Sequence, residues 1–122
     1  MQSLAELTAV VRQDDFFQRL LGNIDNWDAV LDLRDSASFD SSWVQACTMV
    51  DCHEHVSPEA AEQVRQLREY VFKSCFRITR NAEIAACVSD DMGLLGDALG
   101  KQMMTPWLRD MLAAYCSERF PS

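Results

Sequence analysis

Residues 57–80, SPEAAEQVRQLREYVFKSCFRITR, form the longest uninterrupted helical pattern in this sequence. Ser57 is a favoured N-cap residue, and Pro58 suits the first helical position because no backbone N–H is needed there. Apolar residues then recur at intervals of three and four, which predicts one apolar stripe along a helix. Phe72 and Phe76 add a second apolar face. We therefore expect this helix to be covered on two sides, as the central helix of a bundle.

The rest of the chain predicts further helices and no strand. Apolar periodicity and capping residues indicate helices at 3–12, 16–21, 25–34, 41–50 and 107–119, with a loop at 34–39. The segment 81–99 carries one apolar stripe, but Ser89-Asp90-Asp91 interrupts it with cap-forming residues, so it is either one helix or two. The prediction is an all-α fold, a single compact bundle of six or seven helices around the helix at about 57–80, in one domain spanning 1–122.

The charge of the chain is strongly uneven along its length. Net charge is −8, and 48% of the residues are hydrophobic, which is typical of a folded rather than a disordered protein. Residues 1–60 contain eleven acidic and three basic side chains, whereas residues 61–122 contain eight of each. Such a chain repels nucleic acid and anionic membranes, so we expect a protein partner, and a basic one. The alternative is that the acidity only keeps the protein soluble.

Cysteine usage and missing motifs narrow the functional class. The five cysteines lack the spacings of a disulfide scaffold or a zinc site. No signal-peptide pattern and no membrane-spanning apolar run is visible, so we expect a cytoplasmic protein with reduced thiols. There is no G-x-S-x-G motif and no glycine-rich phosphate loop. We expect neither an enzyme nor a bound cofactor.

An acidic series at 25–35 is the first candidate binding site. Asp25, Asp28, Asp32 and Asp35 follow one another at spacings of three and four, which place them on one helix face. Like charges at these spacings cost a helix a few tenths of a kcal/mol per pair, a cost that a basic ligand surface would offset. The alternative is a solvated outer face, with Asp25 serving as a helix cap. Asp14, Asp15 and Asp40 would enlarge the acidic patch if the fold brought them together.

Asp90 and Asp91 are the second candidate site. Two adjacent carboxylates are able to coordinate Mg²⁺ or to act as acid and base, but no second acidic motif completes such a set. A helix cap or kink is the simpler interpretation. A local cap would still leave both acids exposed, and we expect them to contact a partner.

The stretch Asp51-Cys52-His53-Glu54-His55 is the third candidate, because its side chains are all possible metal ligands. His53 and His55 are two residues apart, so they share a face only on extended backbone. Both histidines of the chain lie here, and a metal site would have to recruit ligands from elsewhere. A polar link between helices is the alternative, and we assign no metal ligands.

These features favour a small, acidic protein-binding module. Such a protein suits the inhibition of a basic partner, for example a toxin or a nucleic-acid enzyme, whose surface it would cover. Bacterial immunity proteins and antitoxins are similar to it in this general character, although no motif identifies a family. One alternative is a metal-binding protein or enzyme that uses residues 51–55. Another is a subunit of a helical assembly, packed through the second face of the 57–80 helix or through one exposed ring of the pair Phe16-Phe17.

Overall fold

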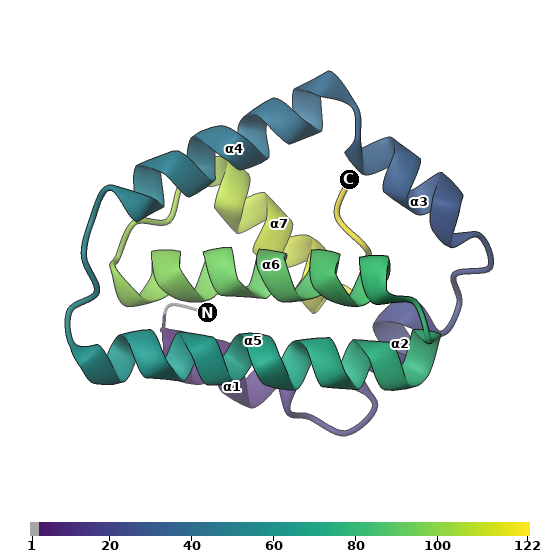
Figure 1. Cartoon of the computed structure of the whole chain (residues 1–122), viewed down its shortest axis with the longest axis horizontal. Coiled ribbons are helices and arrows are strands. Elements are labelled where there is room, and N and C mark those ends of the chain that lie inside the picture. Colours follow the sequence, from purple (N-terminus) through teal and green to yellow (C-terminus); the bar gives the residue numbers. More distant parts are fainter. Residues whose placement is uncertain (1–2) are drawn as a thin grey trace.

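The computed structural model describes residues 3–122, which form seven α-helices and no strand. The helices are α1 (Leu4–Val11), α2 (Phe16–Leu21), α3 (Trp27–Arg34), α4 (Ala37–Asp51), α5 (Pro58–Thr79), α6 (Ala82–Gly100) and α7 (Pro106–Cys116). This confirms the predicted all-α bundle. In Figure 1, α6 lies between α5 on one side and α4 on the other. Helices α1 and α2 pack against α5.

Helix α6, rather than α5, is the most buried helix of the bundle. Twelve of its residues are buried, against four on α5. Gly96 allows close packing, because a Cβ there would lie 3.3 Å from Leu67 Cδ2 of α5. Helix α5 packs against α6 and against α1 and α2, but Phe72 and Phe76 are each 37% exposed, so its second apolar face is not covered as expected. Within residues 3–122, no helix is long and apolar enough to cross a membrane.

Three helix starts confirm the capping signals of the sequence. The side chains of Ser57, Asn81 and Thr105 each accept a hydrogen bond from the backbone N–H three residues further on, at 3.1, 3.1 and 3.2 Å. Each bond satisfies one of the N–H groups that a helix start leaves without an internal partner. The segment after Asn81 is one helix and not two.

Two other helix starts differ from the prediction. Helix α4 begins at Ala37 instead of residue 41, because the hydroxyl of Ser36 accepts a hydrogen bond from Phe39 N and caps it. The predicted loop at 34–39 is therefore mostly helical. Helix α3 is capped by Asn26, so Asp25 lies outside it and is not its cap.

The pair Phe16-Phe17 also differs from the prediction. Both rings are only 4% exposed, and they pack edge to face with their centroids 5.0 Å apart. The expectation that one of them is an exposed anchor is wrong, because the short helix α2 buries two faces against the bundle.

Candidate functional site

A groove of about 420 Å³ separates α3 and α4 from α6. Figure 1 shows α4 and α3 following one another along one side of α6. We call this hollow the acidic groove; it is lined by Leu31, Arg34, Asp35, Phe39, Asp40, Trp43, Glu83, Ala86, Cys87, Asp90 and Asp91.

Four exposed carboxylates surround the acidic groove. Asp35 is the C-cap of α3, Asp40 lies in the first turn of α4, and Glu83 and Asp90 are on α6. Asp90 pairs with Arg68 of α5 at 2.7 Å. Among residues 3–122, Asp35, Asp40 and Glu83 form no ion pair. Three helices thus bring uncompensated negative charge to one hollow.

The walls of the groove between these acids are largely apolar. Phe39 and Trp43 are partly exposed aromatic residues on α4, and Leu31 and Ala86 extend the apolar surface to α3 and α6. Burial raises the pKa of the Cys87 thiol to about 12, and the charge of Asp91 adds to the shift. That thiol is protonated at neutral pH and is not a nucleophile. An apolar wall with an acidic rim suits the aliphatic stem and the cationic end of a lysine or arginine side chain.

An ion pair closes the bottom of the acidic groove. Arg34 of α3 donates two hydrogen bonds to the carboxylate of Asp91, Nη1 to Oδ2 and Nη2 to Oδ1, each at 2.7 Å. Asp91 is fully buried and Arg34 is 9% exposed. Trp43 Nε1 also donates to Oδ1 at 2.9 Å, and the Tyr115 hydroxyl donates to Oδ2. Both oxygens of Asp91 therefore have two donors, so the buried charge is satisfied.

The guanidinium of Arg34 makes further contacts on its other sides. Its Nη1 donates to the carbonyl of Pro121 at 3.0 Å, and its Cζ lies 4.6 and 5.2 Å from the ring centroids of Phe39 and Phe120. Burial by itself would lower the pKa of Arg34, but the hydrogen bonds and charge of Asp91 outweigh it and raise that pKa. Burial also raises the pKa of Tyr115, with Asp91 contributing. Arg34 is thus a cation and Tyr115 a neutral phenol at neutral pH.

The predicted acidic series is only partly assembled at the groove. Asp25, Asp28, Asp32 and Asp35 are all exposed, but only Asp35 lines the hollow. Asp28 and Asp32 are one turn apart on α3, whereas Asp25 precedes the helix.

The predicted pair Asp90 and Asp91 splits between surface and core. Asp90 is exposed on the groove, but Asp91 is fully buried, so the expectation that Asp91 is exposed is wrong. The reason is Arg34, which compensates the carboxylate inside the protein. The sequence signal for burial was the spacing of Asp91, three residues after Val88 and four before Leu95, which puts it on the apolar side of the helix. Nothing in the local sequence around Arg34 indicates that it is the partner.

Sequence reasoning missed one of the groove acids, Glu83, which was not singled out. Asp40 was considered a possible extension of the acidic series, and the fold places it at the groove beside Asp35. The signal for Glu83 was its place seven residues before Asp90, which puts both on one side of a helix.

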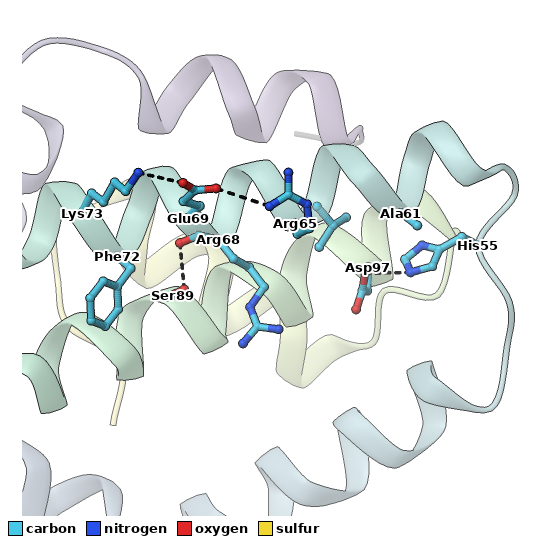
Figure 2. Close-up of a pocket in the computed structure, with 10 residues that line it drawn as sticks. His55, Ala61, Arg65, Arg68, Glu69, Phe72, Lys73, Ser89 and Asp97 are labelled. Carbon is cyan, nitrogen blue, oxygen red and sulfur yellow. Dashed lines mark hydrogen bonds and ion pairs between the residues drawn. The ribbon is translucent and has the colours of Figure 1, made fainter.

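A second hollow of about 500 Å³ lies between α5 and α6 (Figure 2). Figure 2 shows Arg65, Arg68 and Lys73 of α5 around it. Each of these cations is paired, Arg65 with Glu62 and Glu69, Lys73 with Glu69, and Arg68 with Asp90. This hollow therefore presents less uncompensated charge than the acidic groove does.

The side chains of residues 51–55 do not converge on one point. His55 Nε2 lies 3.4 Å from Asp97 Oδ1 on α6 (Figure 2), whereas His53 Nδ1 lies 3.4 Å from the carbonyl of Met49. In the described part of the chain, no three His, Cys, Asp or Glu side chains come together to hold a metal ion. The geometry gives the metal-binding hypothesis no support.

Comparison with known proteins identifies the family. The family model described as "Immunity protein PIM1" matches residues 6–122, which include the acidic groove and the buried cluster. No curated protein matches the chain.

Proposed function

The chain belongs to the immunity protein PIM1 family, and on that premise we propose that it binds a toxin protein and blocks its activity. An immunity protein of this kind acts by occupying a surface of its partner, so its chemistry is recognition and not catalysis. The leading interpretation of the sequence, a protein that inhibits a protein partner, is of the same type. We propose the cytoplasm as its location, and the five free thiols support a reducing compartment.

The acidic groove is the surface that we propose for toxin binding. The observation that carries this proposal is the presence of three uncompensated carboxylates, on Asp35, Asp40 and Glu83, around a partly apolar hollow. Complementary charge steers association and selects the partner, whereas the apolar wall supplies contact area that water leaves on binding. The toxin surface should therefore be basic, with lysine or arginine side chains that reach the groove.

The carboxylates of Asp25, Asp28 and Asp32 have a weaker role in this proposal. They are exposed on and before α3, outside the groove. Charges at the rim of an interface change mainly the association rate and its salt dependence. We propose that these three side chains attract the basic toxin, and that the groove holds it.

Affinity capture from a lysate of the source cell tests this function. Wild-type protein should retain one basic protein, and co-expression should suppress the toxicity of that partner. The variant Asp35→Asn/Asp40→Asn/Glu83→Gln should retain much less of it. The variant Asp14→Asn/Glu59→Gln/Asp110→Asn removes the same charge from exposed positions outside the groove and should behave as wild type. Equal capture by both variants would place the toxin-binding surface elsewhere.

A further inference from the structure

An exposed stripe runs along α5, and part of it borders the hollow between α5 and α6. Its helical members recur at intervals of four, three and four, so they lie on one side of the helix, and the C-cap residue follows directly after the helix end. We call it the α5 stripe; it consists of Arg65, Glu69, Phe72, Phe76 and Arg80, all exposed. The spacing is that of a helix face that packs on another helix.

The centre of the α5 stripe is aromatic. The rings of Phe72 and Phe76 are stacked, with centroids 6.2 Å apart and planes within 4° of parallel. Each side chain is 37% exposed. Two adjacent exposed phenylalanines on a charged helix form an apolar contact point, which is typical of an interface.

We propose that the α5 stripe binds the α5 stripe of a second copy of this chain, antiparallel, in a two-fold symmetric dimer. An isologous interface requires a self-complementary surface, and the stripe has one. If the symmetry axis passes midway between Phe72 and Phe76, each Phe72 faces Phe76 of the second copy. The four rings then form one apolar centre that excludes water.

The charges of the stripe select this orientation. With the axis at position 74, Glu69 lies five residues before it and faces position 79 of the second copy, beside Arg80. Symmetry gives two Glu69–Arg80 pairs, one at each end of the aromatic centre. Parallel pairing would instead set Glu69 against Glu69 and Arg80 against Arg80, which is repulsive. Charge complementarity therefore commits the stripe to an antiparallel second copy.

The charged residues near the ends of the α5 stripe are available for these ion pairs. Arg80 is the C-cap of α5 with φ 54°, and among residues 3–122 it forms no ion pair. Glu69 already contacts Lys73 at 2.7 Å and Arg65 at 3.4 Å, but an exposed carboxylate has capacity for a further donor. The acidic groove is lined by α3, α4 and α6, so a dimer through α5 leaves it open. The dimer thus does not depend on the proposed toxin-binding function.

Sedimentation equilibrium over a concentration series tests the dimer. Wild type should approach twice the monomer mass as its concentration rises. Phe72→Ser/Phe76→Ser should stay monomeric, with its helical circular dichroism retained because both side chains are partly exposed. Glu69→Arg and Arg80→Glu should each weaken dimerisation about tenfold or more, since each creates two like-charge contacts. Asp110→Arg, which reverses an exposed charge on α7, should dimerise as wild type does.

Mixing the two charge variants gives the sharpest result. In a heterodimer of Glu69→Arg with Arg80→Glu, both end pairs are again opposite in charge, so the mixture should dimerise although each component alone does not. The double variant Glu69→Arg/Arg80→Glu should also recover the dimer. A wild-type protein that stays monomeric at every concentration would overturn the proposal. A dimer that the charge variants do not weaken, or that mixing does not restore, would equally overturn it.

Discussion

Arg34 and Asp91, 57 residues apart in the sequence, form a buried ion pair with two hydrogen bonds of 2.7 Å. The pair fastens α3 to the central helix α6, and Trp43 and Tyr115 join it from α4 and α7. It therefore fixes the position of the helices that carry Asp35 and Asp40 relative to α6, which carries Glu83 and Asp90. The width of the acidic groove depends on this contact.

Removing one member of the pair should destabilise the fold strongly. Arg34→Met leaves the carboxylate of Asp91 buried without its counter-ion, and we expect the free energy of unfolding to fall by about 3–5 kcal/mol. Urea denaturation followed by circular dichroism measures the change.

Two further variants make this prediction specific. Arg34→Met/Asp91→Leu removes both charges and should recover part of the lost stability, because no unpaired charge remains. Arg19→Met breaks the exposed pair with Glu118 and should cost about 1 kcal/mol or less. If Arg34→Met lowered the free energy of unfolding no more than Arg19→Met does, the Arg34–Asp91 pair would not hold α3 against α6 as we describe.

Asp97→Asn should stabilise the protein at neutral pH. Burial raises the pKa of Asp97 above its ordinary value of 3.8, although His55 and Lys101 oppose the shift. A carboxyl group with a raised folded-state pKa favours folding below 3.8 and loses that contribution as the pH rises through the raised value. The asparagine variant avoids the loss, so its advantage should be present at pH 7 and disappear near pH 3. Urea denaturation at both pH values checks this, and an advantage confined to acid would contradict it.

Gly93 and Gly96 should respond differently to alanine. At Gly93 a Cβ would lie 2.6 Å from Cδ of Arg68, a flexible exposed side chain that is able to move away. Gly93→Ala should then raise the free energy of unfolding by up to about 1 kcal/mol through the better helix propensity of alanine.

At Gly96 an added Cβ would instead contact side chains of the hydrophobic core. Its Cβ would lie 3.2 Å from Leu4 Cδ1 and 3.3 Å from Leu67 Cδ2, which are packed side chains, so crowding should cancel the gain in propensity. Thermal unfolding of both variants compares them directly. A lower midpoint for Gly93→Ala than for Gly96→Ala would show that Arg68 is held more firmly than its exposure implies.

Local signals in the sequence predicted most of the secondary structure. Ser57-Pro58, Asn81 and Thr105-Pro106 mark helix starts through side-chain and backbone geometry that depends only on neighbouring residues. Ser89-Asp90-Asp91 was ambiguous because such residues compete for local hydrogen bonds. In the fold, Ser89 donates to the carbonyl of Arg68 at 2.9 Å and Asp91 binds Arg34, so the helix continues without interruption.

The candidate site was less predictable, because it depends on contacts between distant helices. The sequence predicted that Asp35 and Asp90 bind a partner; that role stays a prediction, and the fold shows that both line one groove. The sequence could not indicate that Asp91 is neutralised, since Arg34 reaches it only in the folded chain. The exposure of Phe72 and Phe76 could not be predicted either, because the sequence shows that a helix has an apolar face but not whether another helix covers that face.

The association rate with the captured toxin is the most direct test of the central claim that the acidic groove recognises a basic partner. Stopped-flow or surface-based kinetics at low and high salt would compare wild type with Asp35→Asn/Asp40→Asn/Glu83→Gln and with Asp14→Asn/Glu59→Gln/Asp110→Asn. We predict that the groove variant associates about tenfold more slowly at low salt and dissociates faster, that the difference in association narrows at high salt, and that the matched variant stays close to wild type. Equal rates for the two variants, or no dependence on salt, would contradict the account.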